Sequence, residues 1–325
     1  MSKEDSFKLL DAYYGAGGNF IDMASNYQDG TSEKFISEWM EVRGIRDQIF
    51  IATKYTNNIN MGEEGEQTDQ KAMYVGNNKK SLRLSIEQSL KNLRTDYIDF
   101  LYVHWWDYTT SVEEVMDNLH NLVVSEKVLY LGVSDAPAHI VSDANNYAKY
   151  NGKTPFSVYQ GRWSVLYRDF ERKILPMCRR RWKSRRGTCS VVVRSAQMRR
   201  RSADARVASK IGRTVFCQAW ERDENETKMS RALEKVAKEV GAKHVASVAI
   251  AYVMQKSPYV FPLIGSRKVE HLMSNLEALD IALTPEHIQF IDNVVTFDIG
   301  FPYSFFGSPD SDYPFLYKTA GHFDR

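Results

Sequence analysis

The chain has 325 residues, of which 43% are hydrophobic and 12% are aromatic, which supports a substantial core and excludes a wholly disordered protein. Its 43 basic and 41 acidic residues give a net charge of +2, which gives no sign of a nucleic-acid-binding protein. Three cysteines are too few for a disulfide framework, and no apolar run reaches the roughly 20 residues of a membrane span. We therefore expect a cytoplasmic protein that binds neither nucleic acid nor membranes.

The near-neutral total hides one strongly basic segment. Of the 35 residues from Arg179 to Arg213, 13 are lysine or arginine, and Asp204 is the one acidic residue among them. This basic segment carries a net charge of +12, so the rest of the chain carries −10. The protein is therefore a mildly acidic chain interrupted by a basic block.

Short apolar runs typical of buried strands alternate with longer amphipathic runs typical of helices. Within the basic segment the one strand-like piece is 190–194. In chain order the patterns predict a helix over 5–13, a strand over 19–24, a helix over 31–42, strand 48–55, helix 80–93, strand 99–106, helix 111–125, strand 128–134, helix 137–150, strand 156–163, helix 169–178, the strand-like piece 190–194, helices 230–240 and 246–254, strand 259–265, and helices 268–279 and 284–295.

Strand–helix alternation of this kind is typical of parallel β/α units. No glycine-rich dinucleotide fingerprint follows the first strand, so the pattern favours an α/β (β/α)8 TIM barrel over a doubly wound sheet. Because the chain starts on a helix, we expect the barrel to lack its first strand and to have an aberrant seventh strand region. We expect a single barrel domain over 1–325, with the basic segment at 179–213 and an aromatic C-terminal tail at 296–325.

Four polar side chains lie near the C-terminal ends of three successive predicted strands or in the loop just after: Asp22 and Tyr27, then Lys54, then His104. Active residues of β/α barrels occupy the C-terminal ends of strands or the loops just after them. A single polar residue at such a place is more often structural. Recurrence on successive strands favours a shared site, because buried charges must be paired or functional.

These residue types suit proton donation to a carbonyl group. A free tyrosine has a pKa of about 10, and a neighbouring ammonium favours the phenolate and lowers that pKa. Asp22 would hold Lys54 charged, and His104 would hydrogen-bond the substrate oxygen. A hydride must then come from a cofactor.

Several strings of the chain resemble the aldo-keto reductase superfamily, namely GGNFIDMASNYQDGTSE, IFIATK, LYVHWWD and GVSD. LYVHWWD, DFERKILP and FPLIGSRKVEHLMSNLEAL are similar to its fungal aryl-alcohol dehydrogenase branch, which includes norsolorinic acid reductases. The resemblance covers 2–178 and about 212–306. It implies that Tyr27 is the proton donor, that Lys54 and Asp22 tune it, and that His104 orients the carbonyl.

The resemblance also implies an NADPH/NADP+ cofactor. Ser134, Asp135 and Gln160 match the residues that contact the nicotinamide carboxamide. Asp135 stands where the family has asparagine, and an ionised aspartate accepts hydrogen bonds but does not donate them. No metal is implied.

A second group of matches lies near the C-terminus. Gly265, Ser266 and Arg267 stand between a predicted strand and a predicted helix, which is a suitable place for a phosphate, and the resemblance implies that they hold the 2′-phosphate of the cofactor. Asn275 matches the adenine contact. Without the resemblance, Arg267 would equally suit an ordinary basic surface pair with Lys268. Asn275 would then be a solvated helix position.

Aromatic residues near His104 suggest where a substrate would lie. Trp105 and Trp106, together with tail aromatics, would form an apolar wall for an aromatic aldehyde or ketone. The alternative is that the tryptophans are core or interface residues and the tail is loosely packed. The tail aromatics are Phe301, Tyr303, Phe305 and Phe306.

The basic segment stands where the resemblance places the seventh strand and a glycine-rich loop that cradles the pyrophosphate, yet its glycines are Gly187 and Gly212 alone. It is a surface that binds polyanions, a solvated loop without a role, or a stretch translated in a shifted reading frame. We favour the third explanation, because composition changes abruptly at both edges while the spacing is preserved. Twelve net positive charges are not expected to replace a barrel strand, so poor folding or weak NADPH binding is expected.

We thus expect an NADPH-dependent oxidoreductase that interconverts a small aromatic aldehyde or ketone and its alcohol, with secondary metabolism as its setting. The alternatives are a catalytically impaired remnant or binding module with a disrupted cofactor loop, and an arginine-rich polyanion-binding protein on a barrel scaffold.

The reading-frame hypothesis makes a direct prediction about codons 170–215. One of the two other frames of the coding DNA will encode an apolar strand followed by a glycine-rich loop. Sequencing and translating this stretch checks it, and the hypothesis fails when neither frame contains these features.

Overall fold

A computed structural model describes residues 1–59, 68–183, 190–194 and 223–307 of the chain. Within these residues, seven strands form one sheet in which each strand pairs in parallel with the next along the chain. The strands are β1 (Phe20–Asp22), β2 (Phe50–Tyr55), β3 (Ile98–Val103), β4 (Val128–Ser134), β5 (Val158–Arg162), β6 (Ser190–Arg194) and β7 (Val260–Leu263).

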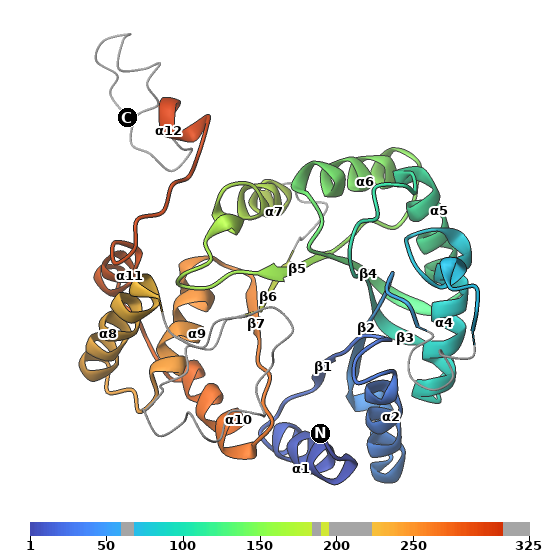
Figure 1. The fold of residues 1–325 in the computed structure, drawn as a ribbon, viewed down its shortest axis with the longest axis horizontal. Helices are drawn as coiled ribbons and strands as arrows, with labels where there is room; N and C mark the ends of the chain where they lie inside the picture. Colours follow the sequence, from blue (N-terminus) through green and yellow to red (C-terminus); the bar gives the residue numbers. More distant parts are fainter. Residues whose placement is uncertain (60–67, 184–189, 195–222, 308–325) are drawn as a thin grey trace.

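Helices surround this sheet on its outer side, so that the strands make an inner ring (Figure 1). The α-helices are α1 (Lys3–Gly15), α2 (Thr31–Arg43), α4 (Lys79–Leu93), α5 (Val112–Val124), α6 (Ala138–Tyr150), α7 (Ile174–Lys183), α8 (Glu224–Glu239), α9 (Val245–Lys256), α10 (Val269–Leu276), α11 (Pro285–Asp292) and α12 (Tyr303–Phe306). The 3-10 helices are η1 (Arg46–Gln48), η2 (Ala72–Tyr74), η3 (Asp169–Glu171) and η6 (Glu277–Leu279). None of the described helices is both long and apolar enough to cross a membrane.

The expected barrel class is confirmed, with one strand fewer than the eight of a complete barrel in the part described. β1 and β7 are the two ends of the described strand order. On the outside, α1 contacts α10, and Figure 1 shows these two helices side by side between the ends of the sheet. The expected helix over 169–178 is instead two pieces, η3 and α7.

β6 lies within the basic segment. Residues 190–194 pair with both β5 and β7, and Val191, Val192 and Val193 are buried. The strand-like piece predicted at 190–194 is therefore a barrel strand, and the surrounding positive charges do not prevent its pairing, because three consecutive β-branched apolar residues suit a strand that is covered on both faces. The stretches 184–189 and 195–222 lie outside the described residues, so the reading-frame hypothesis and the glycine-poor cofactor loop stay predictions.

An aromatic cluster lies along the first three strands. The Phe20 and Phe50 rings stack with centroids 5.3 Å apart, and the Phe100 and Tyr102 rings lie 4.7 Å apart. Gly132 of β4 gives these rings room, because a Cβ there would lie 2.4 Å from a Phe100 ring atom.

A buried polar link joins α2 to its neighbours. Glu33 has no exposed surface, and its two carboxyl oxygens accept hydrogen bonds from Thr53 Oγ1 of β2 (2.8 Å) and Asn92 Nδ2 of α4 (3.0 Å). Thr53 immediately precedes Lys54, and α2 begins four residues after Tyr27. The link therefore holds β2, which carries Lys54, against α2, which follows the loop that carries Tyr27.

Replacing Glu33 tests the strength of this link. We predict that Glu33→Ala lowers the free energy of unfolding by about 2–6 kcal/mol, because it leaves two buried donors without an acceptor at roughly 1–3 kcal/mol each. Glu41→Ala in the same helix is the control: Glu41 pairs with Arg94 in the open, and such pairs contribute about 0–1 kcal/mol. Urea unfolding measures both, and equal losses for the two variants would contradict the prediction.

Candidate active site

A buried ion pair between the first two strands lies at the centre of the site. The ammonium of Lys54 on β2 donates to Asp22 Oδ2 of β1 at 2.6 Å and to the Met23 carbonyl at 2.8 Å. The Lys54 side chain has no exposed surface, and that of Asp22 is 10% exposed. Because a buried ammonium needs a charged partner, the two residues are held in one geometry.

The same carboxylate also reaches across the barrel. Gln160 Nε2 on β5 donates to Asp22 Oδ1 at 2.9 Å, so each Asp22 oxygen has its own donor. Ser25 adds a further contact to this region, since its hydroxyl donates to the Lys54 carbonyl at 2.9 Å. Residues from three strands thus share one buried polar cluster at the C-terminal ends of the strands.

Two tyrosines flank the Lys54 ammonium at the same distance. Lys54 Nζ lies 5.4 Å from the ring centroids of both Tyr27 and Tyr102. Tyr102 is fully buried, and burial raises its pKa well above the ordinary value, with the negative charge of Asp22 raising it further. Tyr27 is 36% exposed. Of these two phenols, Tyr27 is therefore the one that a substrate can reach.

Tyr27 is presented by a tight loop between β1 and α2. Its amide donates to the Ala24 carbonyl at 3.1 Å, and the next residues, Gln28 and Asp29, have positive φ angles of 52° and 54°. Gly30 follows with φ 80° as the N-terminal cap of α2, a conformation that favours glycine. The loop thereby turns Tyr27 back over the end of β2.

His104 follows β3 and is 4% exposed. Its ring centroid lies 6.0 Å from that of Tyr27 and 5.1 Å from that of Trp105. Its Nδ1 atom lies 2.9 Å from Nδ2 of Asn57. Asn57 was missed by sequence reasoning, although it lies three residues after Lys54 in the loop that leaves β2.

The structure separates the two tryptophans. Trp105 is 45% exposed beside His104, whereas Trp106 is 7% exposed and belongs to the main hydrophobic core. Figure 1 shows α12 standing apart from the barrel beyond α11, and Phe301, Phe305 and Phe306 are exposed. The expected wall of two tryptophans and tail aromatics is therefore reduced to Trp105 in the described residues. Residues 308–325 of the tail lie outside them.

Three of the residues assigned to the cofactor carry buried polar atoms without a hydrogen-bond partner among the described residues. These atoms are Ser134 Oγ, Gln160 Oε1 and Asn275 Nδ2. Ser134 and Gln160 are fully buried on the adjacent strands β4 and β5, where they are register partners, and Asn275 is 3% exposed on α10. Because buried polar groups are normally paired, these atoms fit a ligand that supplies the missing partners.

The other cofactor candidates lie at the openings of loops. Gly265, Ser266 and Arg267 lie between β7 and α10, and Ser266 Oγ accepts from the Lys268 amide at 3.0 Å at the start of that helix. Gly265 and Arg267 are exposed. An exposed guanidinium ahead of a helix N-terminus suits an anion such as a phosphate.

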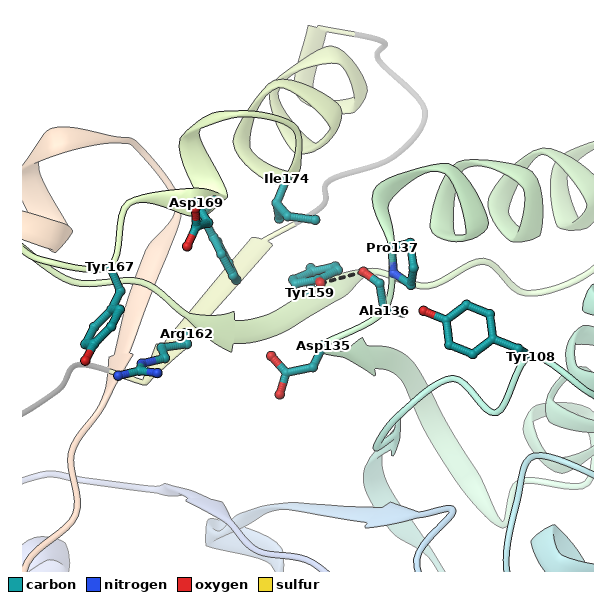
Figure 2. A pocket seen from close by; sticks show the side chains of 10 residues that line it. Tyr108, Asp135, Ala136, Pro137, Tyr159, Arg162, Tyr167, Asp169 and Ile174 are labelled. Atoms are coloured by element: carbon teal, nitrogen blue, oxygen red, sulfur yellow. Dashed lines mark hydrogen bonds between the residues drawn. The ribbon is translucent and has the colours of Figure 1, made fainter. Parts of the chain in front are cut away.

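Asp135 begins the loop after β4 and lines a cavity of about 440 Å³ beyond the ends of β4 and β5. Figure 2 shows Arg162 and Tyr167 on one side of this cavity, with Asp135 between them and Tyr108. The Asp135 amide donates to the Gln160 carbonyl at 3.0 Å, and its φ is +48°. The cavity adjoins the strand ends that carry Ser134 and Gln160.

Comparisons with known proteins agree on one family. A model described as the aldo/keto reductase family matches residues 1–296. The chain is 55% identical over 333 residues to an aryl-alcohol dehydrogenase [NADP(+)] of Phanerodontia chrysosporium, covering 100% of this chain and 84% of that protein. It is 49% identical over 315 residues to a norsolorinic acid reductase of Aspergillus flavus, covering 95% and 76%.

A solved structure supports the same fold. A thermostable aldo-keto reductase in complex with the inhibitor epalrestat superposes with a TM-score of 0.68 at 23% identity, over 90% of this chain and 88% of that chain.

The Lys54–Asp22 pair generates a prediction about stability. We expect Asp22→Asn to lower the free energy of unfolding by about 3–5 kcal/mol, because it leaves a buried ammonium without a counter-charge. Glu87→Gln is the matched control, since Glu87 pairs with Arg83 in the open and an exposed pair contributes about 0–1 kcal/mol. Denaturant titration of both variants is the measurement, and a loss for Asp22→Asn no larger than the control's would refute the expectation.

Proposed function

The chain belongs to the aldo/keto reductase family and is an oxidoreductase, and from this premise we propose that it interconverts a small aromatic aldehyde or ketone and its alcohol with NADPH/NADP+. The similar proteins named for aryl alcohols and norsolorinic acid support an aromatic substrate. We propose secondary metabolism as its setting on the latter similarity.

The observation that carries the proposal is a set of buried polar atoms without a partner in the described residues: those of Ser134 and Gln160 on the strands next to the Lys54–Asp22 pair, and that of Asn275 on α10. Ser134 and Gln160 would hold the carboxamide of a nicotinamide, Asn275 the adenine, and Arg267 with Ser266 the 2′-phosphate. When bound, such a cofactor supplies the hydride that reaches the carbonyl carbon. Asp135 would accept from the carboxamide NH2 group, where asparagine would also donate.

The chain's own residues would handle the proton. Tyr27 would donate its phenolic proton to the carbonyl oxygen, and the nearby ammonium of Lys54 favours the phenolate that results. Asp22 keeps that ammonium charged and in place. His104 would donate a hydrogen bond to the same oxygen, and the exposed ring of Trp105 would contact an aromatic substrate.

The alternative is an impaired family member in which the basic segment 179–213 disrupts the cofactor loop. The pairing of β6 with both neighbours makes the barrel wall continuous at this position, so the strand itself gives no support to the impaired form. Cofactor binding separates the two: intact function needs saturable binding of NADPH, and the impaired form lacks it.

Tyr27→Phe tests the proposed chemistry. We expect the wild-type chain to oxidise NADPH in the presence of benzaldehydes, and Tyr27→Phe to lower kcat by about 10²–10⁴-fold because the proton donor is lost. Quenching of tryptophan fluorescence should show the same NADPH affinity for both proteins, and tighter binding of NADPH than of NADH.

Tyr102→Phe is the matched control, since Tyr102 flanks the same ammonium but is buried. It should retain turnover. Turnover retained by Tyr27→Phe would overturn the assignment of the proton donor, and absence of saturable NADPH binding would favour the impaired form.

A further inference from the structure

The contact between Asn57 and His104 has a chemical consequence. Asn57 lies two residues beyond the end of β2, and its side-chain amide nitrogen lies 2.9 Å from Nδ1 of His104 at the end of β3. An amide nitrogen carries hydrogens and no lone pair for hydrogen bonding, so it is the donor in this contact. Nδ1 is therefore the acceptor, and an accepting ring nitrogen carries no proton.

The loop that carries Asn57 is held in a constrained conformation. Thr56, the residue before it, has φ +112°, which is rare for a β-branched residue. The Thr56 hydroxyl accepts from Asn77 Nδ2 at 2.9 Å, and its carbonyl accepts from the Gly76 amide at 2.8 Å. A strained backbone of this kind persists only where surrounding contacts hold it in place. The constrained loop directs Asn57 toward the histidine.

The histidine is held from the same side. Its backbone amide donates to the Tyr55 carbonyl at 3.1 Å, and Asn77 Nδ2 also donates to the Trp105 carbonyl at 3.0 Å. Asn77 is 1% exposed, so one buried amide ties the loops after β2 and β3 together. The two partners of the Asn57–His104 contact are thereby fixed relative to each other.

We propose that Asn57 is a positioning residue that holds neutral His104 in the tautomer whose proton is on Nε2. With this tautomer Nε2 carries a proton in the neutral ring, as it also does in the charged ring. Nε2 is therefore a hydrogen-bond donor in both forms, as the proposed function requires of a group that binds a carbonyl oxygen. The inference rests on the proposed function only for the role of Nε2 as donor to a substrate carbonyl. The tautomer itself is a property of the free protein.

The titratable groups near His104 come from three elements. Tyr27 faces it from the loop after β1, while the Lys54 ammonium from β2 is paired with Asp22. Asp107, three residues further along, accepts from the backbone of Asn77, Thr109 and Thr110. Burial acts to raise the pKa of Asp107, but these hydrogen bonds outweigh burial and lower it.

Nitrogen NMR of the free protein tests the tautomer directly. Long-range ¹H–¹⁵N correlation spectra of ¹⁵N-labelled protein distinguish protonated from unprotonated ring nitrogens, and loss of one of the seven histidine patterns in His104→Gln assigns the signal. We expect Nδ1 of neutral His104 to be unprotonated and Nε2 to be protonated. The opposite pattern, or a mixture of the two tautomers, would overturn the proposal.

Asn57→Asp supplies the kinetic test with the least change in shape. A carboxylate at this position accepts from Nδ1–H, so neutral His104 loses the proton on Nε2, and the negative charge favours the imidazolium and raises the histidine pKa. Below that pKa both ring nitrogens are protonated and donation is preserved. The ratio of variant to wild-type kcat should therefore be near one at low pH and fall about 10- to 100-fold as the pH rises through the histidine pKa of the variant.

Asn58→Asp is the control, because it adds the same charge one residue further along the loop. It should leave both the ¹⁵N pattern and the pH dependence of kcat unchanged. A pH-independent loss in Asn57→Asp, or the same pH dependence in Asn58→Asp, would assign Asn57 a merely structural role. If the wild type lacks turnover, the proposed function fails, while the NMR pattern still decides the tautomer.

Discussion

The burial of one ammonium group constrains the whole polar end of the barrel. An unpaired ammonium moved out of water costs several kcal/mol even after relaxation, so Lys54 needs a carboxylate at contact distance. Asp22 provides it from the neighbouring strand, and Gln160 then occupies the carboxylate's second oxygen from β5. The first, second and fifth strands are thus bound to one another by a charge that none of them could hold alone.

Around this pair, the polar groups divide into satisfied and unsatisfied sets. Asp22, Lys54 and Glu33 have partners within the protein, and those contacts set the positions of strands and helices. Ser134 Oγ and Gln160 Oε1 have none in the described residues, although both are buried. Gln160 belongs to both sets, since its nitrogen stabilises the ion pair while its oxygen remains available. The fold therefore organises the site before any ligand arrives.

Much of the barrel and the polar strand ends was predictable, because alternation of apolar runs is a local property of the chain. Lys54 and Asp22 stand out as charges at the ends of buried strands. The Gln160–Asp22 bond is different: its partners are 138 residues apart, and no local pattern pairs them. Asn57 lies in a loop without periodicity, and the adjacent tryptophans look alike in sequence although one is core and the other exposed. At β6 the local pattern of three valines predicted the strand, whereas the charge of the surrounding segment argued against it.

The place of β1 in the sheet gives the site an asymmetric vulnerability. β1 is three residues long, and in the described strands it pairs with β2 alone, yet it carries the counter-charge of the buried lysine. Local unfolding of such a short edge strand would separate the ion pair while the six other described strands remain paired. On heating, activity would then be lost at a lower temperature than that at which the barrel unfolds. Inactivation and global unfolding would therefore have two different midpoint temperatures.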